Sequence, residues 1–403
     1  MNRRSVLAGL AAASALARPG AARATGSTAP NFAAFLPSLW PRAQAQGVGR
    51  GVFEAAIAGL AADPGLLGPG PRQSEFLRPM KAYVAEAASA GRVGRGRAAM
   101  ARHAAVLGPV EARSGVPASM VVALWGLESD YGAAMGRKDV VRSLATLAYA
   151  RGEDAPFADE FAFALLMLQR GDVSREGLVG SWAGAMGHPQ FMPSAYLRYA
   201  VPASGQGHAD IWTSVPDSLA SIASFLQQSG WQRGEPWGMQ VVVPAGYDHA
   251  ALRLPMRRFA QLGFRGLDGA TPAGGGEGML FYPVGAGGPA FLLGPNFFVL
   301  KAYNFSDNYA MAGSVLADRI AGREPVSGSW PDEAKPLDAA ERRRIQSRLK
   351  EAGVYQGTVD GRFGPVTRDA VHAWQRQAGV APADGHPSRA VLDRLDREAK
   401  ATR

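Results

Sequence analysis

The sequence predicts a mainly α-helical protein of the α+β class, in which a large helical domain with a small β subdomain precedes a smaller helical module. Three observations predict this arrangement. Long Ala- and Leu-rich runs broken by Gly and Pro fill residues 32–231. Short β-branched or aromatic runs bounded by Gly and Pro fill residues 239–303. A Pro-, Gly- and Ser-rich stretch without periodicity then separates the end of the chain from the rest.

Helical periodicity and helix-ending residues locate the elements of the large domain. We expect helices at residues 74–90, 96–114, 117–131, 158–169, 216–230 and 309–320. We expect strands at MQVVV (239–243), GMLFYPV (278–284) and FFVLKAY (297–303). We therefore predict three parts: a large domain at 30–321, a linker at 322–336 and a helical module at 337–397.

The first 24 residues have the form of an export signal. A basic head is followed by an apolar run at 6–17 and by the small-residue end Ala22-Arg23-Ala24. The pair Arg3-Arg4 favours a twin-arginine signal, with an ordinary secretory signal as the alternative. No later stretch reaches 18 uninterrupted apolar residues, and the chain has no Cys for a lipid anchor. We therefore predict an exported, soluble, periplasmic protein without a membrane anchor.

Charge and composition exclude several functions. Four of the nine surplus positive charges lie in the first 24 residues. The other five are spread over the rest of the chain and do not form the concentrated basic surface of a nucleic-acid-binding protein. They would suit a polyanionic partner such as the cell wall. The six His show no HExxH spacing, which argues against a zinc peptidase. Because the chain has no Cys, it cannot use a cysteine nucleophile. Because it has no G-x-S-x-G motif, it lacks the serine nucleophile of the α/β-hydrolases. We predict no cofactor, no metal and a monomer.

Glu128 is the candidate catalytic residue. Met120, Leu124 and Leu127 recur at helical spacing, and Glu128 lies four residues after Leu124, so its carboxyl group is expected at the edge of the apolar face. Apolar surroundings disfavour the ionised form and raise the pKa of a carboxyl group, as a general acid requires. The alternative is an ordinary solvated Glu near a helix end.

Two further segments contain candidate ligand-binding residues. Small residues surround Ser181, Gln190 and Phe191 in the segment LVGSWAGAMGHPQFMPSAYLRYA (178–200). Small residues allow the backbone to come close to a sugar, and Gln190 can donate and accept hydrogen bonds. The alternative is a tight corner in which the glycines serve only packing. KAYNFSDNYAMAGSVLADRI (301–320) places Asn304 between Tyr303 and Tyr309, where the alternative is a buried Tyr pair with an Asn turn.

Together, ALWGLESDYG, SWAGAMGHPQFMPSAY and KAYNFSDNYAMA resemble the signature blocks of the B-type lytic murein transglycosylases, which are peptidoglycan-cleaving enzymes with a lysozyme-like core. The resemblance extends from about Phe32 to Ile320. The segment IQSRLKEAGVYQGTVDGRFGPVTRDAVHAWQRQAGV resembles the small three-helix peptidoglycan-binding domain, and its Gly-rich turn at 358–364 favours a ligand-binding loop. The resemblance implies that peptidoglycan glycan strands are the partner.

The resemblance also implies residue roles. Glu128 would be the single catalytic acid and base, and Ser181 would help set its ionisation. The substrate groove would be lined by Gln190, Phe191, Tyr303, Asn304, Tyr309 and, more weakly, Tyr83. Two departures from the family pattern bear on these roles. Residues 151–157 lack the Tyr and basic pair of relatives, and the loop 202–210 has one Asp where some relatives bind calcium, so we predict no calcium site.

The resemblance implies cleavage of the MurNAc-β-1,4-GlcNAc bond with closure of a 1,6-anhydro ring and no consumption of water. Two rival functions remain open from the sequence. One is a hydrolytic muramidase that uses a second carboxylate such as Asp130 or Asp210. The other is a non-catalytic cell-wall-binding protein, a function for which the C-terminal module alone would suffice.

Overall fold

The computed structural model describes residues 31–68, 78–152, 155–323, 330 and 336–401. The chain divides into two compact units. Of the described residues, the first unit contains 31–68, 89–152, 155–230 and 302–304, and the second contains 78–88, 231–301, 305–323, 330 and 336–401. The predicted export signal at 1–24 and most of the predicted linker lie outside the described residues. No helix of the described chain is long and apolar enough to span a membrane.

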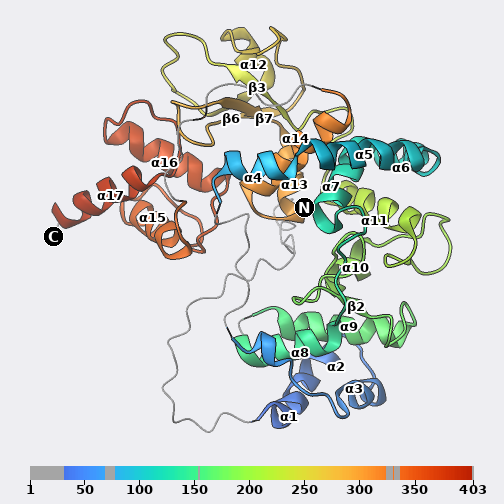
Figure 1. Cartoon of the computed structure of the whole chain (residues 1–403). Helices are drawn as coiled ribbons and strands as arrows, with labels where there is room; N and C mark the ends of the chain where they lie inside the picture. The colour runs from blue at the N-terminus through green and yellow to red at the C-terminus, as the bar shows by residue number, and fades with distance from the viewer. Residues whose placement is uncertain (1–30, 69–77, 153–154, 324–329, 331–335, 402–403) are drawn as a thin grey trace, which may run out of the picture. The chain divides into compact units, whose positions relative to one another are not determined.

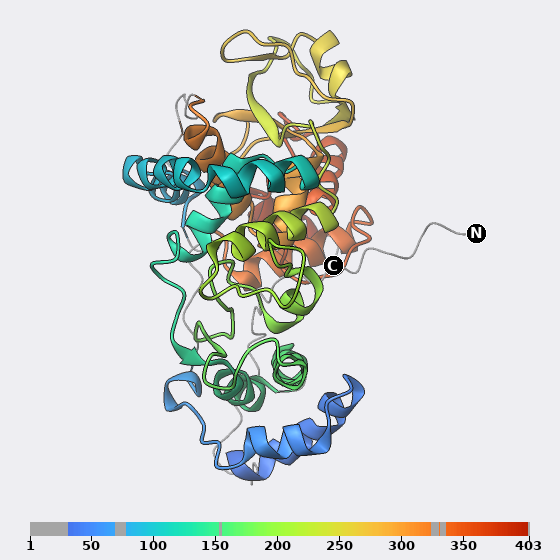
Figure 2. The same ribbon diagram turned by 90° about the vertical axis from the view of Figure 1, so that its right-hand side faces the viewer.

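The first unit is helical. Its short N-terminal elements are α1 (Phe32–Phe35), η1 (Leu36–Leu39), α2 (Trp40–Ala45), α3 (Arg50–Ile57) and η2 (Pro64–Leu66). The longer elements are α5 (Ala90–Arg102), α6 (Ala104–Ser114), α7 (Ala118–Ser129), α8 (Val140–Arg151), α9 (Phe157–Arg170), α10 (Pro193–Tyr199) and α11 (Val215–Gln228), with two short strands, β1 (Lys138–Asp139) and β2 (Val179–Gly180). Helices α8 and α9, drawn in green, pack side by side (Figure 1), and Figure 2 shows the same pair after a 90° turn.

Helix α7 forms the centre of the first unit. Residues 119–126 are all buried, and α5, α6 and α11 pack around the helix. The predicted one-sided apolar stripe is therefore wrong for the middle of α7, because a helix that is apolar all round is buried all round. The helix predicted at 96–114 is also two helices, since the chain breaks at His103 between α5 and α6.

The second unit contains the β subdomain. Its helices are α4 (Met80–Ala87), α12 (Met256–Gln261), α13 (Pro295–Tyr303) and α14 (Asp307–Ile320), the last two residues of α13 belonging to the first unit. Its strands are β3 (Gly238–Val242), β4 (Arg253–Pro255), β5 (Arg265–Gly266), β6 (Glu277–Phe281) and β7 (Ala290–Leu293). They form one antiparallel sheet in the order β4-β6-β7-β3-β5, with Phe259 and Phe264 in the core beneath it.

One strand prediction is wrong. The run FFVLKAY at 297–303 forms most of helix α13, and the strand that follows β6 is AFLL at 290–293. Short apolar runs do not distinguish a buried strand from a buried helix. Here Pro295, at the first helical position, begins a helix because its fixed φ and missing N–H suit that position.

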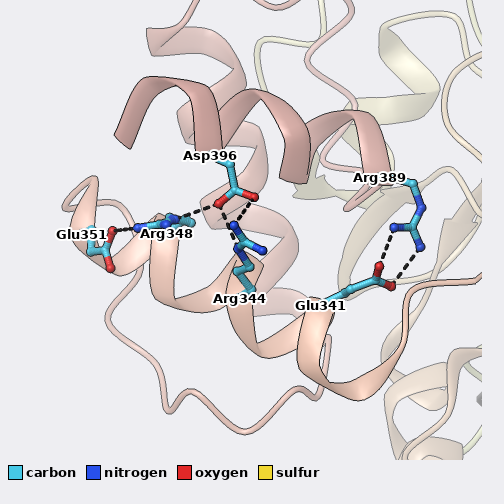
Figure 3. A network of polar contacts seen from close by, with 6 residues as sticks. All are labelled: Glu341, Arg344, Arg348, Glu351, Arg389 and Asp396. Carbon is cyan, nitrogen blue, oxygen red and sulfur yellow. Dashed lines mark hydrogen bonds and ion pairs between the residues drawn. The ribbon is translucent and has the colours of Figure 1, made fainter. Parts of the chain in front are cut away.

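Three helices form the C-terminal module: α15 (Ala339–Glu351), α16 (Pro365–Gln377) and α17 (Arg389–Ala401). Their shared core includes Ile345, Leu349, Val371, Trp374 and Leu395. Figure 3 shows the ion pairs that join α15 to α17. Asp396 accepts from Arg344 and Arg348 at 2.9 Å each, and the two terminal nitrogens of the Arg389 guanidinium contact Glu341. The mainly helical fold with a small sheet and a three-helix module is thus confirmed.

Candidate active site

Glu128 lies in the last turn of α7, where the chain leaves the helix by an unusual route. Asp130, Tyr131 and Gly132 follow with φ values of 48°, 60° and 91°, all in the left-handed region. Non-glycine residues adopt this conformation only where the surroundings hold them there. The side chain of Glu128 is half-buried, beside the buried Ser129. The predicted helix end at residue 131 therefore comes two residues too late, because α7 ends at Ser129.

Helix α5 holds the turn after Glu128. Arg95 donates to the Asp130 carboxylate at 2.7 Å, and Arg92 lies 3.5 Å from the same oxygen. The hydroxyl of Tyr131 donates to the Arg92 carbonyl at 2.9 Å. The hydrogen bond from Arg95 holds the pKa of Asp130 below its usual value. Asp130 is therefore an ionised anchor of this turn.

His188 joins the Glu128 helix to the second signature block. Its Nδ1 accepts from the Trp125 indole N–H at 3.0 Å, and its carbonyl accepts from the Ser129 hydroxyl at 2.8 Å. The Ser129 hydroxyl in turn accepts from the Gly132 amide at 3.2 Å. Sequence reasoning did not single out Trp125, Ser129 or His188. All three lie within the signature blocks, but only the fold shows that they meet.

A pH dependence follows from His188. Burial lowers the pKa of His188 below the ordinary value of 6.5, because desolvation disfavours the charged ring. The ring is also neutral at Nδ1, where it accepts from Trp125. Below about pH 6.5 the unfolded chain therefore binds more protons than the folded chain, and the free energy of unfolding falls as the pH falls. His188→Asn should flatten this fall, by at most about 1.4 kcal/mol per pH unit. Urea unfolding at several pH values between 7.5 and 5 measures it, and equal slopes for variant and wild type would contradict it.

The second signature block lies against the segment that follows Glu128. Gly180 pairs with Lys138 across β1 and β2, and any side chain at Gly136 would collide with the Gly180 carbonyl. Gly180 also bridges to Met186, which bridges to Phe191. This series of backbone contacts fixes the loop 180–191 beside the loop 130–138.

Ser181 and Gln190 occupy this loop. The Ser181 hydroxyl accepts from the Ala185 amide at 3.1 Å, so it stabilises the tight turn in which it lies. Gln190 has a φ of 51°, and its side-chain amide donates to the carbonyls of Met135 at 3.0 Å and Gly187 at 2.9 Å. Both side chains are half-buried. Gln190 thereby ties the two loops together.

The third signature block reaches the same region through Tyr303. Its hydroxyl donates to the Pro189 carbonyl at 2.8 Å, and its ring packs with those of Phe191 and Phe225. Burial raises the pKa of Tyr303 well above its ordinary value, and the charge of Glu128 raises it further. Tyr303 and Glu128 therefore influence each other electrostatically.

Phe191 supports the site from inside the unit. Its side chain is only 2% exposed and lies between Phe225 and Tyr303. A ring buried to this depth has little surface with which to contact a sugar. Its predicted contact with substrate is therefore limited by its position.

The remaining predicted residues fall in two places. Asn304, half-buried, follows Tyr303 directly in the first unit. Tyr83 and Tyr309 belong to the second unit, on α4 and α14, which pack against each other. The first unit thus brings together Glu128, Tyr303, Asn304 and the loop with Ser181 and Gln190.

The loop 202–213 uses its carboxylates internally. Asp217 accepts from the amides of Ala203 and Asp210 at 2.9 Å each, and Asp210 accepts from the amides of Trp212 and Thr213 at 2.9 Å each. Although burial acts to raise the pKa of Asp210, the bonds from Thr213 and Trp212 hold it below its usual value. No group of three or more His, Asp or Glu suited to a metal ion occurs among the described residues.

These hydrogen bonds predict the response to calcium. Because both carboxylates already order the loop, adding millimolar CaCl₂ should leave the unfolding temperature of the protein unchanged, as should a chelator. Differential scanning fluorimetry with CaCl₂, MgCl₂ and EGTA measures this. A rise in unfolding temperature specific to calcium would contradict the prediction.

The sequence matches two known families. Residues 31–318 match the family described as "Transglycosylase SLT domain", and residues 338–395 match "Putative peptidoglycan binding domain". The chain is 35% identical over 213 residues to "Membrane-bound lytic murein transglycosylase B" of Escherichia coli K12, a match that covers 51% of this chain and 58% of that protein.

Solved structures resemble the chain over more of its length. SltB3 from Pseudomonas aeruginosa in complex with NAG-NAM-pentapeptide is 41% identical, with a TM-score of 0.78, and the match covers 90% of this chain and 99% of that one. SltB1 from the same organism is 30% identical, with a TM-score of 0.61 and coverage of 73% and 99%. The resemblance noted from the signature blocks is confirmed: the chain belongs to the lytic transglycosylases of the SLT-domain family and carries a C-terminal peptidoglycan-binding domain.

Proposed function

We propose that this protein cleaves the β-1,4 bond between N-acetylmuramic acid and N-acetylglucosamine in peptidoglycan and leaves a 1,6-anhydro-muramic end. The observation that carries the proposal is the half-buried Glu128 at the end of the buried helix α7, followed by a turn that Arg95 and Ser129 hold in place. The solved relative SltB3 has been crystallised with NAG-NAM-pentapeptide and with NAG-anhNAM-pentapeptide, which are a substrate-like and an anhydro form of this sugar pair.

Glu128 acts twice in this reaction. Its protonated carboxyl group donates to the glycosidic oxygen as the bond to C1 of muramic acid breaks. The 2-acetamido group of the same sugar stabilises the oxocarbenium-like carbon. The ionised Glu128 then accepts the proton of the C6 hydroxyl, whose oxygen attacks C1 and closes the ring. One proton is given and one is taken, so no water is consumed.

The neighbouring residues position these groups. Asn304 orients the acetamido group, Ser181 helps set the ionisation of Glu128, and Tyr303 shapes the pocket. Gln190 fixes the loop that faces the sugar through its bonds to Met135 and Gly187. Tyr83 and Tyr309 serve as further substrate-binding residues, and Phe191 packs behind Tyr303.

A single-carboxylate mechanism is favoured over hydrolysis by the state of the two alternative carboxylates. Asp130 is bound by Arg95 and Arg92, and Asp210 by the backbone and side chain of its own loop. A base or nucleophile must be available to water or sugar, and both groups already serve structural partners. A purely cell-wall-binding role is disfavoured by the intact Glu128 block.

Export and assembly complete the proposal. Residues 1–24 direct the chain to the periplasm through the twin-arginine or the general secretory route, and the mature protein acts there as a monomer. The catalytic domain spans 30–321, a linker 322–336, and the binding domain 337–397. Neighbouring matches to the two families at 31–318 and 338–395 support this division.

The test is digestion of isolated sacculi followed by mass spectrometry of the released muropeptides. We expect 1,6-anhydro products, which are lighter by one water than the reducing products of a muramidase. Reducing ends as the main product would favour hydrolysis. No release, with binding to sacculi retained, would favour the non-catalytic role.

A further inference from the structure

A three-residue connection, 304–306, joins helix α13 to helix α14 and contains Asn304. Lys301 lies in the last turn of α13, and Asp307 is the first residue of α14, so the two residues stand on either side of this connection. The Lys301 ammonium donates to the Asp307 carboxylate at 2.5 Å. Because charge-assisted hydrogen bonds are short and strong, this bond fixes the distance between the two helix ends.

The C-terminal module completes the arrangement. Arg368 of α16 donates to the other carboxylate oxygen of Asp307 at 2.6 Å. Lys301 also donates to the carbonyl of Phe363, in the loop before α16, at 3.1 Å. The Arg368 guanidinium lies 4.4 Å from the centre of the ring of Phe281, the last residue of β6. Each oxygen of Asp307 therefore has one cation as its partner, and one of the two cations belongs to the module.

Burial leaves this cluster few alternative arrangements. Lys301 and Arg368 are both buried, and the Asp307 side chain is only 16% exposed. A buried charge that loses its partner is not resolvated by water, so breaking one pair is strongly unfavourable. The two ends of the connection are therefore held in one place. A side chain of the module thus helps to order the connection that contains Asn304.

We propose that Arg368 is a positioning residue for glycan cleavage. Through Asp307 it holds the connection 304–306, and with it the Asn304 side chain that orients the acetamido group of the substrate. The inference rests on the proposed function for this role of Asn304. It gives the module a part in the chemical step that is separate from any contact between the module and the substrate.

The test uses three substitutions at Arg368 in the full mature chain. Arg368→Gln removes the charge and leaves the pair of Lys301 and Asp307, which is neutral as a whole. Arg368→Met does the same with a side chain that still covers Phe281, and it takes the place of the Gln variant if that variant fails to fold. Arg368→Lys keeps the charge and tests for rescue.

The matched control is Arg253→Gln. Arg253 lies on β4 and pairs with Asp369 of the module at 3.1 Å, so this variant weakens the contact between the module and the β subdomain without removing a member of the cluster. Release of anhydro products from soluble glycan strands, measured over a range of substrate concentrations, gives kcat and KM for each variant.

We expect Arg368→Gln and Arg368→Met to lower kcat about 10–100-fold, because a small misplacement of an orienting group has an effect of this size. KM should stay within about twofold of the wild-type value, since the lost interaction acts in the transition state. Arg368→Lys should restore most of kcat, and Arg253→Gln should keep the wild-type values of both constants.

Hydrogen exchange tests the same proposal without cleavage. Amides in peptides that cover residues 301–307 should exchange at least about tenfold faster in Arg368→Gln than in the wild type or in Arg253→Gln. Amides in the core of the first unit should exchange at the wild-type rate, which shows that the variants are folded.

Three results would overturn the proposal: unchanged exchange at 301–307 in folded Arg368→Gln, an equal loss of kcat in Arg368→Gln and Arg253→Gln, or a rise in KM with kcat unchanged. Absence of anhydro products from the wild type would instead refute the proposed function. The exchange at 301–307 would then still decide whether Arg368 orders the connection.

Discussion

Glu128→Gln releases no detectable 1,6-anhydro-muropeptides from purified sacculi. The substitution keeps the shape of the side chain and removes the proton that the glycosidic oxygen must receive. It also removes the base that must then accept the C6 hydroxyl proton. Each step of general acid or base catalysis contributes about 10²–10⁴-fold to rate, so we expect a loss of at least about a thousandfold. Mass spectrometry of timed digests measures the loss.

The matched control is Glu176→Gln, an exposed Glu in the same unit, which should digest sacculi at the wild-type rate. Circular dichroism and thermal unfolding should show both variants folded. Pelleting with sacculi should show that Glu128→Gln still binds. Near-normal turnover by a folded Glu128→Gln protein would remove Glu128 from the mechanism.

The second large effect is on stability, at the buried charge cluster of Lys301, Asp307 and Arg368. Lys301 is 6% exposed and Arg368 9%, and Asp307 contacts both. Burial acts to raise the pKa of Asp307, but the two cations outweigh it and hold the pKa below its usual value. Asp307→Asn leaves two buried cations without their carboxylate, which costs about 3–5 kcal/mol in free energy of unfolding. Urea or guanidinium unfolding measures this cost.

A matched substitution separates burial from charge. Asp369→Asn breaks the pair with Arg253, whose distance is 3.1 Å and whose side chains are both 39% exposed. Exposed pairs contribute at most about 1 kcal/mol. A similar loss of free energy of unfolding in the two variants would show that the buried cluster around Asp307 stabilises the protein no more than an exposed ion pair does.

Residue patterns predicted the elements whose signals are local. Helix α9 lies within one residue of its predicted bounds, and α14 begins two residues earlier than expected. The composition of the run at 297–303 suits both a strand and a helix, and only Pro295 marks it as a helix. Helix α8 has no clear start signal in the sequence, because it follows directly on a short strand without a break in composition.

The site was predicted in part. The signature blocks mark segments that the fold joins, for example through the hydrogen bond from the Tyr303 hydroxyl to the Pro189 carbonyl. The sequence could not show that His188 accepts from Trp125, since that bond joins residues 63 positions apart. Nor could it predict the left-handed backbone of Asp130 and Gln190, because only glycine is recognisable as a residue that adopts it freely.

The close approach of Gly136 to the Gly180 carbonyl limits how this enzyme can evolve. A methyl group at Gly136 would strike the Gly180 carbonyl of the other loop, and a methyl group at Gly180 would strike the Ala185 carbonyl within its own loop, so both positions require glycine. We expect changes in substrate preference to arise at partly exposed neighbours such as Trp182 and Ala183, while Gly136 and Gly180 stay invariant. Homologues that act on other cell-wall substrates should therefore vary at these neighbouring positions and keep both glycines.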